Sequence, residues 1–276
     1  MEYRIAKQEE YPALCRLWQD VFGDSQQFAQ RAFDEFIGHD GVYVAADETG
    51  PVAQLCSVPV KLQGRNGGYL YALATRPDRR GEGIMHALID HACQQLLLRG
   101  CSFVCLIPAG PSLFDFYGQQ GFVKAFGLRK FTMPVRHNLW AQAEFDNLTA
   151  RALLQMRKKY APDSVEMSLE SFSVVMSDLY TGGVTVVNTN EGYGLYFVKD
   201  ETLRFIELFA DSEKAAENLV EAAREKERAE QAEFILGNEQ TLFMGAGEPL
   251  DYGMIRFLAQ PFDVHDSYMR LMLDEQ

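Results

Sequence analysis

The feature that most constrains the fold is a strand, a glycine-bearing loop, a helix and a second strand within residues 69–107. Residues 69–75 have the composition of a strand, and residues 76–83 form a polar loop. Residues 84–98 place apolar side chains on one helical stripe, and residues 102–107 are almost wholly apolar, as expected for a central strand. A chain that alternates in this way folds into layers of helices and sheet.

The flanking segments complete one domain of this kind. Helical spacing of apolar residues is found at residues 9–22 and 25–37, and a short helix is expected at residues 111–120. Further strands are expected at residues 3–6, 41–46, 52–60 and 121–133. This order predicts an α/β layered domain at residues 1–135, with a mixed central sheet flanked by helices.

After a connector at residues 134–140, the second half of the chain repeats part of the order of strands and helices predicted for the first. A helix at 169–179 precedes strands at 184–187, 192–198 and 203–209; a charged helix at 212–230 and strands at 234–236 and 254–258 follow. We therefore predict a second, degenerate copy of the domain at residues 136–276. Its strand-to-helix link, Ala210-Asp211-Ser212, has no glycine. Asp211 would repel a phosphate and is expected to cap the helix, so we do not expect this copy to bind a phosphate-bearing ligand. Its expected role is instead to form a wall of the pocket for an acceptor substrate, or to form a dimer contact.

The charge distribution and the cysteines exclude several classes of protein. Residues 1–136 carry 14 basic and 14 acidic side chains, so the net charge of −13 arises entirely from residues 137–276. Binding to nucleic acid is therefore disfavoured, whereas a cationic substrate is slightly favoured. The simpler interpretation, which we prefer, is that the acidic excess keeps the protein soluble. The five cysteines include no CxxC pair, so neither a disulfide framework nor a metal site is expected. With no membrane-length apolar stretch and no export signal, we expect a cytoplasmic protein that does not bind membranes.

The loop at residues 76–83 suits an anion. Gly81 and Gly83 allow an anion to approach the main chain, and the following helix directs its free N–H groups at the same place. Such a nest fits a pyrophosphate, to which Arg79 and Arg80 could add positive charge. The dinucleotide fingerprint GxGxxG and the lysine of a nucleoside-triphosphate loop are both missing from this segment. A tight turn with solvated arginines is the alternative reading of the loop alone.

A second segment adds a family resemblance. Phe116-Tyr117 and Gly121-Phe122 follow the central strand and resemble the late FYxxxGF signature of the GCN5-related N-acetyltransferase (GNAT) superfamily. The loop segment Arg80-x-x-Gly83-x-Met85 resembles the RxxGxG/A signature of the same superfamily, although Met85 stands in place of the usual small residue. The resemblance covers residues 1–133. A nucleotide-binding α/β protein would fit the loop but not the second segment.

The resemblance implies a site for acetyl-CoA, the co-substrate of the family. The strand before the loop would splay from the central strand and pair with the pantetheine arm, and one of its N–H groups would polarise the thioester carbonyl. Tyr117 occupies the position of the general acid that protonates the departing thiolate after direct attack by the amine. The residues expected to bind the cofactor are Leu73, Ala74 and Thr75 on the strand and Arg80, Gly81, Glu82, Gly83, Ile84 and Met85 in the loop and helix.

The general base and the acceptor are not identified by any motif. Asp34, Glu35 and His86 are candidates for the base by position only. The segment Cys105-Leu106-Ile107-Pro108 and the large residue at Met85 resemble the tandem-repeat enhanced-intracellular-survival type, in which the terminal carboxylate takes part in catalysis; here that carboxylate belongs to Gln276.

Two functions follow from the sequence. The first is acetyl-CoA-dependent N-acetylation of a small-molecule amine. The alternative is a catalytically silent acyl-CoA-binding regulatory or interaction protein. Homo-oligomer formation stays open.

Overall fold

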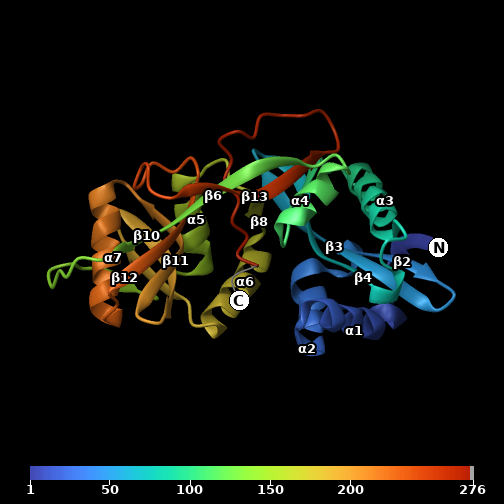
Figure 1. Ribbon diagram of the computed structural model, residues 1–276, viewed down its shortest axis with the longest axis horizontal. Helices are drawn as coiled ribbons and strands as arrows, with labels where there is room; N and C mark the ends of the chain where they lie inside the picture. The colour runs from blue at the N-terminus through green and yellow to red at the C-terminus, as the bar shows by residue number, and fades with distance from the viewer. Residues whose placement is uncertain (274–276) are drawn as a thin grey trace. The chain divides into compact units, whose positions relative to one another are not determined.

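The computed structural model describes residues 1–273, which form two compact units. The first unit comprises Met1–Lys124, Glu166–Ser171 and Gly253–Asp263, and the second comprises Ala125–Val165, Phe172–Tyr252 and the chain from Val264. Each unit contains strands and helices (Figure 1). Each also has its own hydrophobic core. The division differs from the single boundary expected between residues 135 and 136, because residues 125–135 belong to the second unit and two short segments of the second half belong to the first.

The first unit is built on a mostly antiparallel sheet in the order β1-β2-β3-β4-β5-β13, in which only β4 and β5 are parallel. The short strand β8 pairs with β3. The bounds are β1 (Glu2–Ile5), β2 (Val42–Asp47), β3 (Gly50–Leu62), β4 (Arg65–Thr75), β5 (Phe103–Leu106), β8 (Glu166–Met167) and β13 (Glu248–Phe257), of which Met254–Phe257 pairs with β5.

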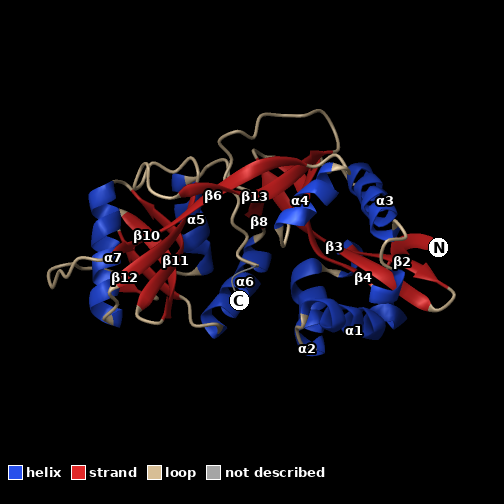
Figure 2. Ribbon diagram, in the orientation of Figure 1, coloured by secondary structure: helices blue, strands red, loops and turns tan. Residues whose placement is uncertain are grey.

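Helices cover both faces of this sheet (Figure 2). Neighbouring residues of a strand point to opposite faces. In β4, Leu70 belongs to the core cluster beneath α3, whereas Tyr71 meets Trp18 of α1 edge to face. The helices are α1 (Tyr11–Phe22), α2 (Gln26–Arg31), α3 (Ile84–Leu98) and α4 (Pro111–Gly118), with a π-helical segment Ala32–Ile37 and 3-10 turns Gln8–Glu10, His39–Gly41 and Pro77–Arg79.

The second unit has a sheet in the order β6-β12-β11-β10-β9-β7, with β11 and β12 parallel. Its strands are β6 (Val123–Pro134), β7 (Glu144–Phe145), β9 (Thr185–Thr189), β10 (Gly192–Lys199), β11 (Thr202–Ala210) and β12 (Gln231–Gly237). Its helices are α5 (Ala150–Tyr160), α6 (Leu169–Thr181) and α7 (Glu213–Glu227), of which α5 was not foreseen. Within residues 1–273, no helix combines the length and apolarity needed to cross a bilayer.

The same order of elements occurs in both units. An antiparallel meander of three strands leads into a helix and then into a strand parallel to the third: β2-β3-β4-α3-β5 in the first unit and β9-β10-β11-α7-β12 in the second. The predicted fold class, a mixed sheet flanked by helices, is confirmed. The similarity between the two halves that the sequence suggested therefore corresponds to a repeated order of strands and helix.

Two strands have partners that were not predicted. Residues 254–258 were expected to close the second set of strands, but Met254–Phe257 pairs antiparallel with β5 and completes the first unit's sheet. Residues 121–133 were assigned to the first domain, but β6 pairs along Leu128–Pro134 with β12 of the second unit. The alternation of apolar residues identifies a strand but does not encode its neighbour.

Candidate active site

The end of β4 separates from β5. The two strands pair only where Gly67–Tyr69 lies beside Phe103–Cys105, although β4 continues to Thr75. Gln54 of β3 faces Ala74 whereas Cys56 faces Tyr71, so two residues of β4 oppose one of β3. This bulge is centred on Ala72, whose φ of +50° lies in the left-handed region. Ala74 and Thr75 stay paired with β3, but the opposite edge of Leu73–Thr75 is not paired with β5, which is the arrangement that the predicted splay requires.

The loop that follows β4 ends at an uncapped helix. Gly81 and Gly83 have φ of +82° and +75°, a conformation that residues with side chains seldom adopt. Gly83 is the N-cap of α3 and provides no side-chain acceptor for the N–H groups of the first turn. A Cβ atom at either glycine would meet nothing within 4 Å, so conformation rather than crowding explains these two glycines. The arrangement is a nest of donors suited to an anion.

These two features border one cavity of about 720 Å³, which we call the β4–α3 cavity. A volume of this size is typical of small-molecule sites. Eight of the ten predicted site residues line it: Leu73, Thr75, Arg80, Gly81, Gly83, Ile84, Met85 and Tyr117. Ala74 is turned into the protein interior, and Glu82 is exposed beside the cavity. The roles of all ten residues remain predictions.

Four apolar residues of the lining were not predicted. Val21 and Phe22 come from the end of α1, and Leu113 and Phe116 come from α4. Phe22 is 44% exposed although it is strongly apolar. Sequence spacing places these side chains on helices but does not show which helix ends border the loop.

Tyr117 is held by a compact aromatic group. Its ring lies edge to face with Phe116 and Phe122, at centroid distances of 5.1 and 5.7 Å. Gly121, with φ of +81°, reverses the chain after α4, so the Phe122 N–H donates to the Tyr117 carbonyl at 3.2 Å. The local geometry therefore accounts for the spacing of the second signature. Burial raises the pKa of Tyr117 to about 12, so its hydroxyl stays protonated at neutral pH.

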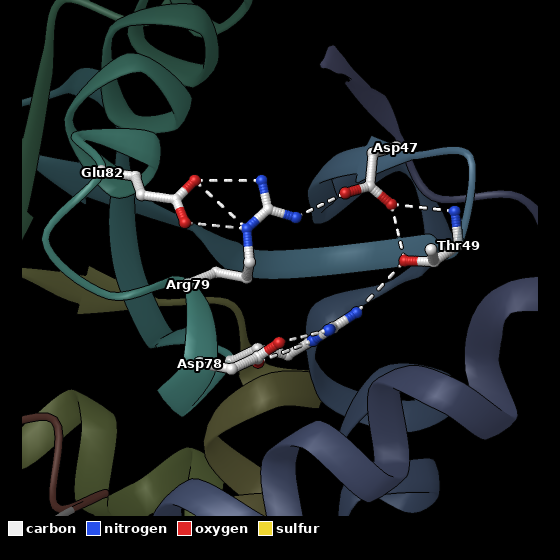
Figure 3. Close-up of polar contacts among 6 residues, drawn as sticks. Asp47, Thr49, Asp78, Arg79 and Glu82 are labelled. Atoms are coloured by element: carbon white, nitrogen blue, oxygen red, sulfur yellow. Dashed lines mark hydrogen bonds and ion pairs between the residues drawn. The ribbon is translucent and has the colours of Figure 1, made fainter.

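Arg79 and Arg80 have different environments. Arg79 was expected to contribute charge for phosphates, but it forms ion pairs with Asp47 and Glu82 (Figure 3). Arg80 is exposed, and its Nε donates to the Thr75 carbonyl at 3.2 Å. Both arginines line the β4–α3 cavity, but the guanidinium of Arg79 is already paired with two carboxylates, so Arg80 is the better placed of the two to contact a phosphate.

The three candidates for the general base lie in different places. Asp34 and Glu35 are exposed on the π-helical segment and do not line the β4–α3 cavity, and Asp34 accepts hydrogen bonds from Gln30. His86 lines the cavity and lies 3.6 Å from Asp90. Gln276 lies outside the described residues. Over residues 1–273, no group of three or more His, Cys, Asp or Glu side chains is arranged to hold a metal ion.

The corresponding helix of the second unit is capped. Ser212, rather than the expected Asp211, is the N-cap of α7, and its hydroxyl accepts from the Ala215 N–H at 3.1 Å. Asp211 stands one residue too early to cap and instead accepts from Lys159 at 2.7 Å and from Tyr160 at 2.9 Å. One of the donors that would bind an anion is therefore already satisfied.

The bulged strand of the second unit also differs from β4. In β11 the register shifts just before Glu207, much as it shifts before Ala74 in β4. Glu207 is 1% exposed and accepts hydrogen bonds from Tyr193 at 2.6 Å, from Tyr268 at 3.0 Å and from Arg157. A buried, fully partnered ionic cluster thus occupies this part of the second unit.

Comparisons with known proteins agree with this geometry. Residues 2–125 match the family described as acetyltransferase (GNAT) domain. An acetyltransferase of Pectobacterium atrosepticum is 30% identical over 113 residues, which cover 39% of this chain and 75% of that protein.

Solved structures resemble the chain over nearly its whole length. A GCN5-related N-acetyltransferase of Anabaena variabilis has a TM-score of 0.72 at 16% identity, covering 93% of this chain and 72% of that one. Eis1 of Mycobacterium abscessus has a TM-score of 0.72 at 14% identity, covering 94% and 74%. At such low identity the likeness concerns the fold alone.

Proposed function

The chain belongs to the GCN5-related N-acetyltransferase superfamily, as its two signatures predicted, and we propose that it transfers an acetyl group from acetyl-CoA to the nitrogen of an amine. One observation carries the proposal. The splayed end of β4, the uncapped start of α3 and the buried hydroxyl-bearing ring of Tyr117 border a single cavity. An acyl-CoA thioester needs all three: a polar strand edge, an anion nest and a proton donor.

The cavity residues divide the binding task between them. The first-turn N–H groups of α3, beginning at Ile84, would donate to the pyrophosphate, together with Arg80. The edge of Leu73–Thr75 would pair with the amide groups of the pantetheine arm. When bound, acetyl-CoA supplies the activated acetyl group as a thioester. A backbone N–H next to the bulge at Ala72 would donate to the thioester carbonyl oxygen, where negative charge develops during attack.

Tyr117 would protonate or hydrogen-bond the departing sulfur. A thiol of ordinary pKa near 8.5 leaves more readily when a donor stands beside it. Since the pKa of Tyr117 is about 12, its main contribution is a persistent hydrogen bond rather than complete transfer of the proton at neutral pH. The residues that line the cavity include His86 but no carboxylate. We propose that the amine loses its proton to water and attacks in its neutral form, and that the proton released from nitrogen after attack is taken up by the departing thiolate through water.

The acceptor is proposed to be a small cationic amine. The excess of acidic residues in the second half of the chain attracts cations and raises their local concentration. This field also favours amines that carry more than one positive charge over neutral amides or alcohols.

The first experiment is a calorimetric titration with acetyl-CoA, followed by measurement of free thiol release with a panel of amines. We expect micromolar binding, which Gly83→Glu abolishes because it places a carboxylate in the nest and strains a residue with φ of +75°. Folded wild-type protein that does not bind acetyl-CoA would overturn the proposal.

The alternative, a silent acyl-CoA-binding regulatory protein, is supported by the lack of a carboxylate among the lining residues. Binding of acetyl-CoA without thiol release on any amine, at neutral or alkaline pH, would favour it.

A further inference from the structure

Arg79 joins two parts of the first unit that are distant in the sequence (Figure 3). Its Nη1 donates to Asp47 Oδ2 at 2.5 Å, at the end of β2. On its other side, Nε and Nη2 donate to the two carboxylate oxygens of Glu82 at 2.9 and 3.0 Å. We call this arrangement the Arg79 bridge. All three nitrogens of the guanidinium are engaged, and the fork geometry with Glu82 is the strong, bidentate kind.

Asp47 is itself fixed in the β2–β3 turn. It accepts from the Thr49 N–H at 2.9 Å and from the Thr49 hydroxyl at 2.6 Å. The hydroxyl and amide of Thr49 and the guanidinium of Arg79 together hold the pKa of Asp47 well below its usual range. The Thr49 hydroxyl also accepts from Arg76 at 3.2 Å, which adds a second link between this turn and the loop. The bridge thus connects the loop to a rigid hairpin.

Glu82 stands at the point where the loop is most free to change shape. It lies between Gly81 and Gly83, the two residues with positive φ that form the nest. Glycines lose more conformational entropy on ordering than other residues do. A loop that is ordered before binding avoids that cost when the ligand arrives. A contact that fixes Glu82 therefore fixes the nest.

We propose that Asp47 and Arg79 are positioning residues that hold the glycine loop in its anion-binding conformation through Glu82. The inference rests on the proposed function, since the anion is the pyrophosphate of coenzyme A. Arg79 then acts on the loop rather than on the phosphate, and its charge is offset by two carboxylates.

A titration with coenzyme A itself, without an acceptor, tests the proposal. Asp47→Asn, Glu82→Gln and Arg79→Lys should each weaken binding about fivefold, because each breaks the bridge while keeping a similar shape. A purely electrostatic role predicts the opposite sign for Asp47→Asn and Glu82→Gln, since removing a negative charge near a phosphate site strengthens binding. Stronger or unchanged binding in these two variants would overturn the proposal.

Asp78→Asn is the matched control. Asp78 is an exposed aspartate of the same loop that pairs with Arg76, two residues away, at 2.6 Å. Its removal deletes the same charge without breaking the Arg79 bridge, so coenzyme A binding should not weaken. A loss equal to that of Asp47→Asn would contradict the proposal, because Asp78 makes no contact with Arg79 in the bridge.

Two further readouts separate positioning from folding and from catalysis. The double variant Asp47→Asn/Glu82→Gln should lose less affinity than the product of the single effects, because both act through Arg79. In turnover, KM for acetyl-CoA should rise while kcat stays unchanged. Wild-type protein that fails to bind coenzyme A would contradict the proposed function; binding that is the same in wild type and Asp47→Asn would contradict the bridge alone.

Discussion

Tyr117 is buried and also borders the cavity, the two conditions that its proposed role as a proton donor requires. Its ring is packed between Phe116 and Phe122, yet it lines the β4–α3 cavity. Packing fixes the position of the hydroxyl, and burial disfavours the phenolate, which raises the pKa. A proton donor that is both fixed and protonated is what a departing thiolate requires.

Replacing Tyr117 with phenylalanine tests this role. The ring and its aromatic contacts remain, so coenzyme A affinity and thermal stability should stay close to those of the wild type. The rate constant kcat should fall about 100-fold, the lower end of the effect of a general acid. Stopped thiol-release assays and calorimetry measure the two quantities separately. A variant that loses affinity rather than turnover would assign Tyr117 to binding.

The raised pKa of Tyr117 also predicts the pH profile. A phenol is active as a donor only when protonated, and a pKa of about 12 keeps it protonated as the pH rises from about 7 to 10. The neutral fraction of the amine increases over the same range. The rate at subsaturating amine should therefore rise up to the amine's own pKa and then level off, with no descending limb below about pH 11.

Two amines of different basicity provide the control for the pH profile. The plateau should begin near pH 8 for an α-amine and near pH 10 for an alkyl amine. If the rate instead rises over the same pH range with both amines, the group that titrates belongs to the protein and acts as a general base.

At the scale of elements, the two units differ at the start of the helix that follows the three-stranded meander. The nest at α3 is formed by glycines and has no side-chain acceptor, whereas Ser212 satisfies a first-turn donor of α7. The difference is one residue type at one N-cap position, in two elements of equal length. It explains why the sequence predicts cofactor binding by the first unit alone.

A substitution in the nest tests the importance of its backbone conformation. Gly81→Ala forces a β-carbon into the left-handed region, at a cost of about 1 kcal/mol. The substitution shifts the free loop away from the conformation that the Arg79 bridge holds, so the cost falls on binding, and the Kd for coenzyme A should rise about fivefold. Gly110→Ala is the control, since Gly110 has an extended backbone and open space around it. Equal affinities for both variants and the wild type would show that the nest does not hold the phosphates.

Local motifs were more predictable than long-range contacts. The helix at residues 84–98 was predicted with its observed bounds because Gly83 and Gly100 mark its ends. Tyr117 was placed at the cavity because its signature reflects a turn of only a few residues. Asp47 lies between the strands expected at residues 41–46 and 52–60, and the sequence does not show its contact with Arg79, because that contact depends on the register of the hairpin. A sequence pattern predicts the local conformation of a segment, whereas the residues that the segment contacts depend on the whole fold.

At the scale of the whole molecule, the first unit depends on a strand from near the end of the chain, β13. The first unit is not a continuous N-terminal piece, because Met254–Phe257 pairs with β5. The four residues of β5 are nearly or fully buried. Without β13, a central apolar strand would become an edge, which is a site of aggregation and of lost stability.

Truncation after residue 135, the boundary expected from the sequence, tests this dependence. The fragment keeps every residue that lines the β4–α3 cavity, so its composition alone would allow it to bind coenzyme A. We expect instead a fragment that aggregates or unfolds without cooperativity, because the edge of β5 and part of the core around Met254 are exposed. Circular dichroism during thermal unfolding and analytical ultracentrifugation measure the outcome.

Adding a peptide of residues 248–263 should restore order by supplying the strand. A fragment that melts cooperatively and binds coenzyme A as the full chain does would show that β13 is dispensable and that the first unit ends where the sequence placed it.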